Sequence, residues 1–280
     1  MTGIDKKLLI GDLKALGLGA GDWIAVHSSV KSIGWVEGGP VEVIEALIES
    51  VAPGGIVMMP LFVIPDEEPI DLAIRPTYLG LLPETFRKYP GVARSFHPTH
   101  SVGIHGPGAH EIAASHRNST YIGRGSPYHQ LALNRGWVLH VGTDFNSGSI
   151  IHLAEVLAEV PYLNISYPGF ERAFTARATD GSTITAEPRE VPADSKMFYL
   201  VQEEMDRRGL LQKGMIGRAP SILARAGEIV DVAVEMMRED PWQFLCDFPY
   251  CSACRKAEKL KDRAAGPAPC EKEVFNERES

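Results

Sequence analysis

The stretch that decides the fold runs from residue 22 to residue 59 and reads DWIAVHSSVKSIGWVEGGPVEVIEALIESVAPGGIVMM. It opens with an apolar run at 22–27, which predicts a short buried strand. We expect a helix at 40–51, because Pro40 suits a first turn and the apolar side chains repeat at helical spacing up to Pro53. A second apolar run follows at 56–59. Strand, polar loop, helix and strand in this order are typical of an α/β domain.

The flanking sequence continues this alternation of helices and strands. The segment at 4–16 has apolar side chains at helical spacing and ends at Gly17, which predicts a helix. Residues 170–187 alternate in polarity around an Asp-Gly turn, which predicts a β-hairpin. The other expected elements are a helix near 79–89, a buried strand at 136–142 and a helix from about 149 to 158.

These elements predict a fold class. We expect a single α/β domain with a central mixed β-sheet flanked by helices, plus a β-hairpin insertion and a helical C-terminal part. The domain is predicted to span residues 1–255, with a charged C-terminal tail at 256–280. Seven prolines interrupt the segment 60–100 and predict a long loop there. Long loops inside a compact domain are usually functional.

The composition argues against several classes of protein. Of the 280 residues, 44% are hydrophobic and 23% are charged, as in packed globular proteins. The net charge of −8 argues against a nucleic-acid partner and mildly favours cationic ones. No stretch approaches the roughly 18 apolar residues of a membrane span, and charged residues interrupt the first 26 positions, where a secretory signal would lie. We therefore expect a cytoplasmic protein without a membrane partner.

The first stretch suited to chemistry follows the first predicted strand. It combines backbone N–H groups, hydroxyls and one positive charge, which suit a diphosphate group. Its residues are His27, Ser28, Ser29, Val30, Lys31 and Ser32. The alternative is an ordinary loop whose serines cap the next helix, because neither the P-loop spacing nor the dinucleotide-binding motif is present.

The second stretch is 94–108, with three histidines within nine residues. It lacks the acidic ligand and the i,i+4 spacing of a helical metal site, so we expect these residues to line a cleft rather than to bind metal.

The third stretch places Ser149, His152 and Glu155 three residues apart, along one stripe of a predicted helix. A carboxylate bound to one imidazole nitrogen fixes the tautomer and leaves the other nitrogen to act as a general base. The chain has no G-x-S-x-G motif, so Ser149 is a poor candidate for a covalent nucleophile, and we expect direct attack by the substrate. The alternative is a helix start whose histidine is only a surface or core group.

Taken in this order, the three stretches resemble the aminoglycoside 3-N-acetyltransferase family. Members share an H-S-S/T loop, an R-S-x-H-P-x-x-S segment and a T-x-x-H-x-x-E helix, and the resemblance covers residues 5–165 nearly without gaps. It implies an α/β fold distinct from that of the commoner N-acetyltransferase superfamily. It also implies that acetyl-CoA is the co-substrate and that a cationic small molecule, an aminoglycoside antibiotic, is acetylated at its 3-amino group.

The resemblance assigns roles to individual residues. His152 matches the family's general base and Glu155 its orienting carboxylate, while Ser149 stands where the family has a threonine beside the thioester. The residues that match the cofactor channel are His27, Ser28, Ser29, Val30, Lys31, Ser32, His100, Ser101 and Val102.

Two departures concern the acceptor amine. Leu153 stands where resistance enzymes have a tyrosine, which removes an aromatic contact with the acceptor. The predicted loop carries carboxylates that are expected to bind a polycationic acceptor, and the alternative is a solvated acidic loop. These carboxylates are Asp66, Glu67, Glu68 and Asp71. Two other functions stay open: the same acyl transfer to a non-aminoglycoside amine, and non-catalytic sequestration of a cationic drug.

All four cysteines lie at or after residue 246, far from the histidines, which end at residue 152. A cytoplasmic location argues against disulfides, and the Cys251-x2-Cys254 spacing is typical of zinc sites. We therefore expect a structural zinc site at Cys246, Cys251 and Cys254, for which the sequence offers no clear fourth ligand, since Cys270 lies in a Gly/Pro/Ala-rich stretch. The alternative is a group of reduced thiols.

Overall fold

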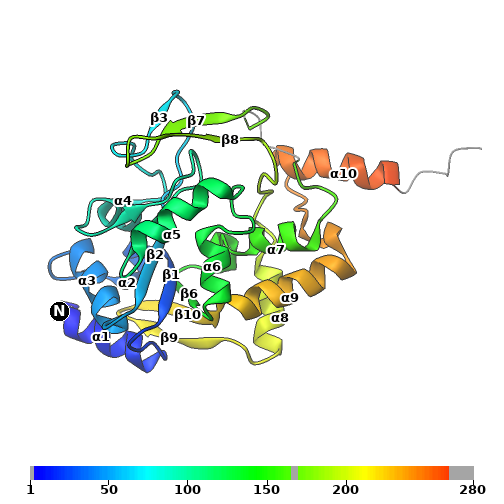
Figure 1. Ribbon diagram of the computed structural model, residues 1–280. Coiled ribbons are helices and arrows are strands. Elements are labelled where there is room, and N and C mark those ends of the chain that lie inside the picture. The colour runs from blue at the N-terminus through cyan, green and yellow to red at the C-terminus, as the bar shows by residue number, and fades with distance from the viewer. Residues whose placement is uncertain (1–2, 165–169, 265–280) are drawn as a thin grey trace, which may run out of the picture.

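The centre of the molecule is a seven-stranded sheet, seen in a computed structural model that describes residues 3–164 and 170–264 (Figure 1). The strand order is β4-β5-β2-β1-β6-β10-β9. In the middle, β1 (Trp23–Ser28) runs parallel to β2 (Ile56–Pro60) on one side and to β6 (Trp137–Val141) on the other. These are the three strands expected from the apolar runs, and those expectations are confirmed.

Antiparallel strands flank this parallel centre and make the sheet mixed, as predicted. β5 (Val102–His105) pairs with β2, and β10 (Ala219–Arg225) pairs with β6. The two edges are β4 (Ala93–Arg94) and β9 (Gln212–Ile216).

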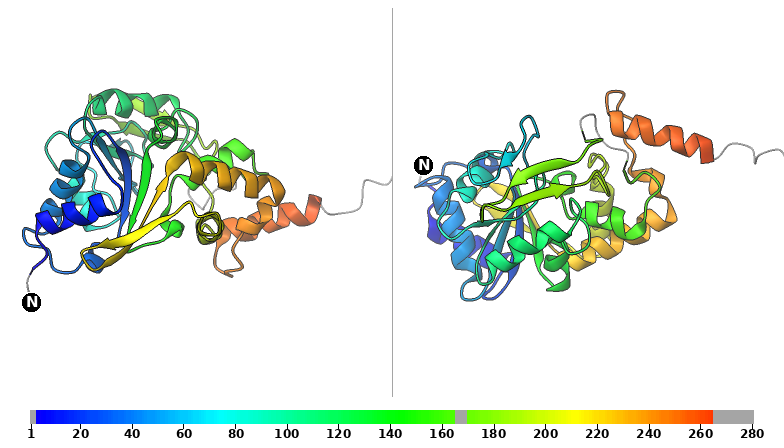
Figure 2. Two further views of the ribbon diagram at one scale, coloured as in Figure 1. Left: turned by 90° about the horizontal axis from the view of Figure 1, so that it is seen from below. Right: turned by 45° about the horizontal axis from the view of Figure 1, so that its top comes forward.

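Helices cover both faces of the sheet (Figures 1 and 2). On one face, Ile24 and Val26 of β1 join a core cluster with α1 and α3. On the other face, Ala25 joins a second cluster with α6, α7 and α9. Successive strand residues point to opposite faces, so a strand covered on both sides is apolar throughout. This is why β1 appears in the sequence as a continuous apolar run.

The helices on the first face are α1 (Lys6–Ala15), α3 (Pro40–Val51) and α4 (Leu81–Arg87). The helices of the second cluster are α5 (Ala109–Ser115), α6 (Pro127–Leu133), α7 (Ile151–Ala158), α8 (Tyr199–Arg207) and α9 (Ala226–Glu239). The helices predicted near 4–16, 40–51, 79–89 and 149–158 are confirmed, although α7 begins two residues later than expected. Short helical turns complete the connections: α2 (Val30–Ile33), η1 (His116–Asn118), η2 (Phe145–Ser147) and η3 (Pro241–Phe244).

A small second sheet lies beside the main one. Its hairpin, β7 (Phe174–Arg177) and β8 (Thr183–Ala186), turns at Gly181, which adopts a positive φ of 82°. This confirms the predicted hairpin. β3 (Ile70–Asp71), which belongs to the proline-rich loop, pairs in parallel with β7. The loop is therefore fastened to the hairpin.

At the C-terminal side, α10 (Ser252–Ala264) projects from the body of the molecule (Figures 1 and 2). It continues across residue 255, the domain end predicted from the sequence, and that boundary stays a prediction. Between residues 3–164 and 170–264, no helix combines the length and apolar character needed to cross a membrane.

A buried arginine holds the irregular segment 61–75 in place. Arg94 is only 4% exposed, and burial lowers its pKa to about 9. Its Nη2 donates to the Leu61 carbonyl at 2.9 Å, and its Nη1 donates to the carbonyls of Leu72 and Arg75 at 2.9 and 2.5 Å. Its Nε donates to the Ser101 hydroxyl at 2.8 Å. One guanidinium thus replaces the partners that a strand or helix would supply.

The variant Arg94→Lys tests this role. A lysine has its three N–H donors on one nitrogen and cannot reach the four acceptors that the Nε, Nη1 and Nη2 atoms of Arg94 serve, so buried carbonyls lose their partners. We expect the free energy of unfolding to fall by about 3 kcal/mol, measured by urea denaturation. As a control, Arg207→Lys alters an arginine that is 70% exposed, and we expect a change within about 0.5 kcal/mol. Equal stabilities for the two variants would contradict the assignment.

Candidate active site

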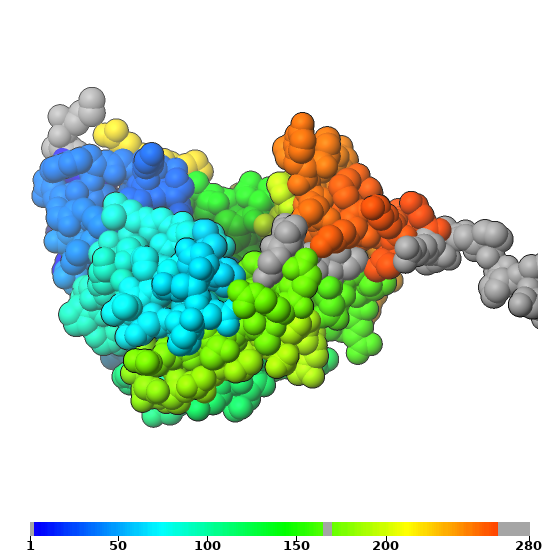
Figure 3. Space-filling view, turned by 90° about the horizontal axis from the view of Figure 1, so that it is seen from above, coloured from blue at the N-terminus to red at the C-terminus, as the bar shows by residue number. Residues whose placement is uncertain are grey.

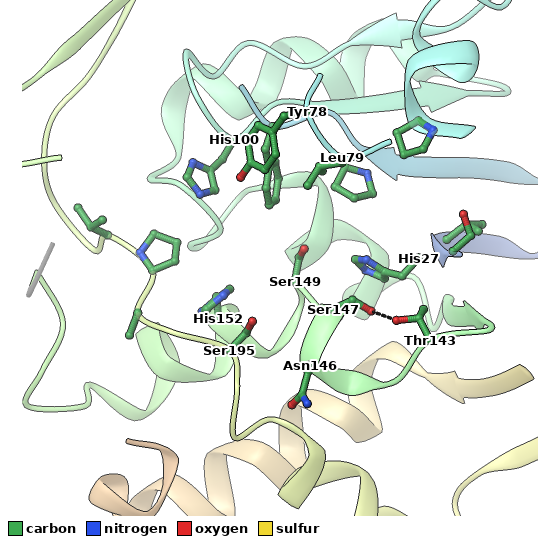
Figure 4. A pocket seen from close by; sticks show the side chains of 18 of the residues that line it. His27, Tyr78, Leu79, His100, Thr143, Asn146, Ser147, Ser149, His152 and Ser195 are labelled. Atoms are coloured by element: carbon green, nitrogen blue, oxygen red, sulfur yellow. Dashed lines mark hydrogen bonds between the residues drawn. The ribbon is translucent and has the colours of Figure 1, made fainter. Parts of the chain in front are cut away.

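A cleft of about 540 Å³ opens at the carboxyl ends of the parallel strands (Figures 3 and 4). His27 and Ser28 line it at the end of β1, Pro60 at the end of β2, and Thr143 just after β6. In open α/β sheets, this edge is where ligands bind, because the loops that leave the strands meet there.

Two segments outside the strands form the walls of the cleft. One is the long loop, which contributes Phe62, Tyr78 and Leu79, and the other is the segment 191–195. The floor is the turn and helix start that follow β6, with Asn146, Ser147, Ser149 and His152. Figure 4 shows the side chains of Tyr78, His100, Ser149 and His152 facing a common space.

His152 and Glu155 form a hydrogen-bonded pair on α7. His152 Nδ1 lies 2.7 Å from Glu155 Oε2, and their side chains are 11% and 1% exposed. The edge of the Phe198 ring packs against the imidazole at a centroid distance of 4.8 Å. The carboxylate therefore occupies one ring nitrogen and leaves Nε2 for a substrate in the cleft. The sequence spacing predicted this contact, and the structure brings the two residues together.

Ser149 lies in the turn before α7 rather than on the helix itself. It is 8% exposed, lines the cleft, and its hydroxyl points into the space between His152 and His27 in Figure 4. Its carbonyl accepts the backbone N–H of His152 at 3.2 Å, so the two residues keep a fixed relation. The hydroxyl therefore lies at the surface of the cleft.

The predicted cofactor loop reaches the cleft only in part. His27 and Ser28 line it, whereas Ser29, Val30, Lys31 and Ser32 are not among its lining residues. Ser29 stands at the N-cap of α2, but its side chain makes no capping hydrogen bond, and its hydroxyl accepts the Ser32 hydroxyl at 3.1 Å. The alternative that these serines cap the helix is therefore wrong.

His27 is a neutral group at this end of the cleft. Its ring stacks on His140 at a centroid distance of 5.1 Å, and its Nε2 has no hydrogen-bond partner among the described residues. Burial lowers the pKa of His27 to about 4. At neutral pH, the only cation of this loop is therefore the exposed Lys31.

Of the three residues predicted to border the same channel, only His100 lines the cleft. Burial first, and then the nearby His152, lowers the pKa of His100 to about 3. The Ser101 hydroxyl is buried and donates to the Leu61 carbonyl at 3.0 Å, and Val102 belongs to the core. Ser101 and Val102 thus support the cleft wall from behind.

The four acidic residues predicted to bind the acceptor are not among the lining residues of the cleft. Asp66 and Glu67 form ion pairs with Arg75, and Glu68 forms one with Arg172. Asp71 Oδ1 accepts the backbone N–H of Ala73 at 3.0 Å. Their role in acceptor binding stays a prediction, and an incoming ammonium group would have to compete with these arginines.

The position after His152 does not face the acceptor. Leu153 is fully buried in the core, so a side chain there makes no contact within the cleft. The aromatic groups that line the cleft come instead from Phe62, Tyr78 and Phe170.

The sequence analysis did not predict two groups of residues that line the cleft. The polar turn at 143–147 directly follows a buried parallel strand, which is a recognisable signal for a ligand-binding edge. The segment 191–195 carries no motif that marks it.

The cysteines form a separate cluster. Cys246, Cys251 and Cys254 are buried free thiols, and Asp194 joins them, with one ligand atom from each residue within 4.8 Å of the others. None of the four residues lines the cleft. Cys270 lies outside the described residues.

The amino-acid sequence is similar to those of known acetyltransferases. A family model described as aminoglycoside 3-N-acetyltransferase matches residues 25–238. Aminoglycoside N(3)-acetyltransferase IV from Salmonella sp is 33% identical over 242 residues, which cover 86% of this chain and 90% of that protein. The aminoglycoside N(3′)-acetyltransferase-like protein YokD from Bacillus subtilis is 32% identical over 252 residues, covering 81% and 90%.

Solved structures agree with these relatives. A mutant of aminoglycoside acetyltransferase AAC(3)-IVa in complex with a gentamicin aligns with a TM-score of 0.80 at 31% identity, covering 91% of this chain and 98% of that one. AAC-IIIb in a binary complex with CoASH aligns with a TM-score of 0.73 at 27% identity, covering 85% and 97%.

The fold, the cleft and these similarities together define an acyltransferase. The chain belongs to the aminoglycoside 3-N-acetyltransferase family, and its fold is that of this family rather than of the commoner N-acetyltransferase superfamily.

The buried histidines predict how stability changes with pH. Burial lowers the pKa of His27 and His116 to about 4, below the value of about 6.5 in an unfolded chain. Between pH 6.5 and 4 the unfolded chain therefore binds protons that the folded protein does not, and the free energy of unfolding falls as the pH falls. Each such histidine contributes up to about 1.4 kcal/mol per pH unit.

His116→Gln tests this directly in urea denaturation series at several pH values. We expect its stability to decline less steeply below pH 6.5 than that of the wild type, by about 1 kcal/mol per pH unit. His110→Gln, at an exposed position, serves as the control and should keep the wild-type slope. An unchanged slope in His116→Gln would refute this explanation.

Proposed function

We propose that the protein transfers the acetyl group of acetyl-CoA to an amine of an aminoglycoside antibiotic, at the 3-amino group by family membership. The observation that carries this proposal is the His152–Glu155 pair, 2.7 Å apart, at the floor of the cleft. Relatives support both substrates: AAC-IIIb was solved with CoASH, and AAC(3)-IVa was solved with a gentamicin and with apramycin.

The proposed reaction begins with the acceptor amine, which is protonated near neutral pH and cannot attack until it loses a proton. Glu155 holds Nδ1 of His152, so Nε2 accepts that proton. The amine nitrogen then bonds to the thioester carbon and forms a tetrahedral intermediate with a negatively charged oxygen. The carbon–sulfur bond breaks, the oxygen regains its double bond, and the sulfur leaves with the proton from His152 as the thiol of CoA. The nitrogen, which still carries one proton more than a neutral amide, releases it to solvent.

Ser149 is the proposed donor to the oxygen of the intermediate. Its hydroxyl points into the cleft beside His152, and a donor positioned in advance stabilises the charge that develops in the transition state. The first backbone N–H groups of α7 are less suited, because those of Ile151 and His152 already donate to Gly148 and Ser149.

We propose that acetyl-CoA lies along the end of β1, with His27, Ser28 and His100 against its pantetheine arm. Ser29, Val30, Lys31 and Ser32 would then flank the diphosphate at the rim, where Lys31 supplies the positive charge. Ser101 and Val102 act only through the wall that they support.

Replacing the proposed base is the central test. We expect His152→Ala to lower kcat by about 10²- to 10⁴-fold, the usual contribution of general base catalysis. The assay follows CoA thiol release with acetyl-CoA and a panel of aminoglycosides and other amines. Glu155→Gln should lower kcat less, because the histidine remains but loses its orienting charge.

The matched control is His110→Ala, which changes an exposed histidine outside the cleft and should keep wild-type kcat. Equal turnover in His152→Ala and the wild type would refute the mechanism. Turnover with other amines but no aminoglycoside would change the acceptor only. Drug binding without thiol release in any condition would favour sequestration.

A second experiment concerns the acidic loop. If its carboxylates bind the acceptor, the double variant Asp66→Asn/Glu67→Gln should raise KM for the aminoglycoside several-fold and leave both kcat and KM for acetyl-CoA unchanged. The control is Glu203→Gln on α8, a carboxylate that does not line the cleft. An unchanged KM in the double variant would show that these carboxylates only neutralise Arg75.

A further inference from the structure

We propose that Asp194, Cys246, Cys251 and Cys254 form a structural zinc site in which the aspartate is the fourth ligand. One ligand atom from each residue lies within 4.8 Å of the other three. Each residue is at most 4% exposed. Three thiolates and one carboxylate are a ligand set that zinc accepts in tetrahedral geometry.

The local geometry suits such a site. With Zn–S bonds of about 2.3 Å, the sulfur atoms of a tetrahedral site lie about 3.8 Å apart, so this cluster needs only a small contraction. Cys251 directly precedes α10 and Cys254 lies in its first turn, which brings the two thiols of the C-x-x-C spacing together. The backbone N–H of Cys246 donates to Cys254 Sγ at 3.4 Å, a contact that stabilises a thiolate.

Asp194 is held in a position to act as a ligand. Its Oδ1 accepts the backbone N–H of Lys196 at 2.7 Å, which fixes the plane of the carboxylate. Its Oδ2 accepts the Cys251 thiol at 2.9 Å and therefore points into the cluster. Supporting bonds of this kind orient the ligands of metal sites.

The surroundings of the cluster suit a cation bound by anionic ligands. Three thiols and one carboxylate converge in a buried space, and zinc would bind the three sulfurs as thiolates. The negative charge that remains lies beside two cations: Lys196 pairs with Asp194, and Arg255 donates to the Cys246 carbonyl.

The proposed zinc joins two distant parts of the chain next to the active site. Asp194 lies between Ala193 and Ser195, which both line the cleft, whereas the cysteines come from the segment after α9. The zinc would therefore hold the 191–195 wall against the base of α10.

The test begins with elemental analysis of the full chain, purified without chelators and with Cys270→Ser as the matched control. We expect about one zinc per chain in the wild type and in Cys270→Ser, and a loss of most of that zinc in Cys254→Ser and Asp194→Ala. Zinc lost from Cys270→Ser but retained in Asp194→Ala would assign the fourth ligand to Cys270 and overturn our choice. Full zinc content in Cys254→Ser would overturn the site itself.

Cobalt substitution of the wild type covers the case in which a variant fails to fold. Cobalt bound by three thiolates and a carboxylate gives strong visible absorption and a sulfur-to-cobalt charge-transfer band in the near ultraviolet. Neither band should appear if the thiols are free or have formed a disulfide, and that result would refute the proposal.

Removing zinc with a chelator should lower the melting temperature and raise KM more than it lowers kcat, because the metal supports the 191–195 wall and not the base His152.

Discussion

The cleft depends on one constraint: the buried carbonyls of an irregular segment must find donors. Between residues 61 and 75 the chain has prolines where a helix or strand would have N–H groups, and Arg94 supplies the missing donors to Leu61, Leu72 and Arg75. A buried polar group without a partner costs about 1–3 kcal/mol. Without this guanidinium, the carbonyls of Leu61, Leu72 and Arg75 would lose this donor, in the segment that presents Phe62 to the cleft.

The same region keeps its histidines neutral. Burial lowers the pKa of His27 and His100, so both imidazoles are uncharged at neutral pH. Neither ring therefore repels a cationic acceptor beside His152. Among the histidines that line the cleft, only His152 has a carboxylate on one ring nitrogen. The fold thus distinguishes His152 from its neighbours by the carboxylate of Glu155, and the other two histidines are uncharged groups in the cleft wall.

Local pattern predicted the centre of the fold well, because β1, α3 and β2 have apolar spacing that admits one interpretation. The spacing of His152 and Glu155 was equally informative, because residues three apart on a helix are neighbours. The fourth ligand of the cysteine cluster and the ion pairs of the acidic loop could not be predicted from sequence, because they depend on contacts that no local pattern encodes. Asp194 reaches the cysteines across more than fifty positions, and Arg75 neutralises acidic residues that had looked available. No spacing rule applies to either pairing.

The parallel pairing of β3 with β7 has a consequence for how members of this family can diverge. The loop that carries one wall of the cleft shares a sheet with a hairpin that follows it by about a hundred residues. A change in the length of either partner would disturb the pairing of Ile70 and Asp71 with Ala176 and Arg177, so the conformation of the loop depends on that of the hairpin. Recombination that moves an acceptor loop between relatives should therefore succeed only when the hairpin travels with it.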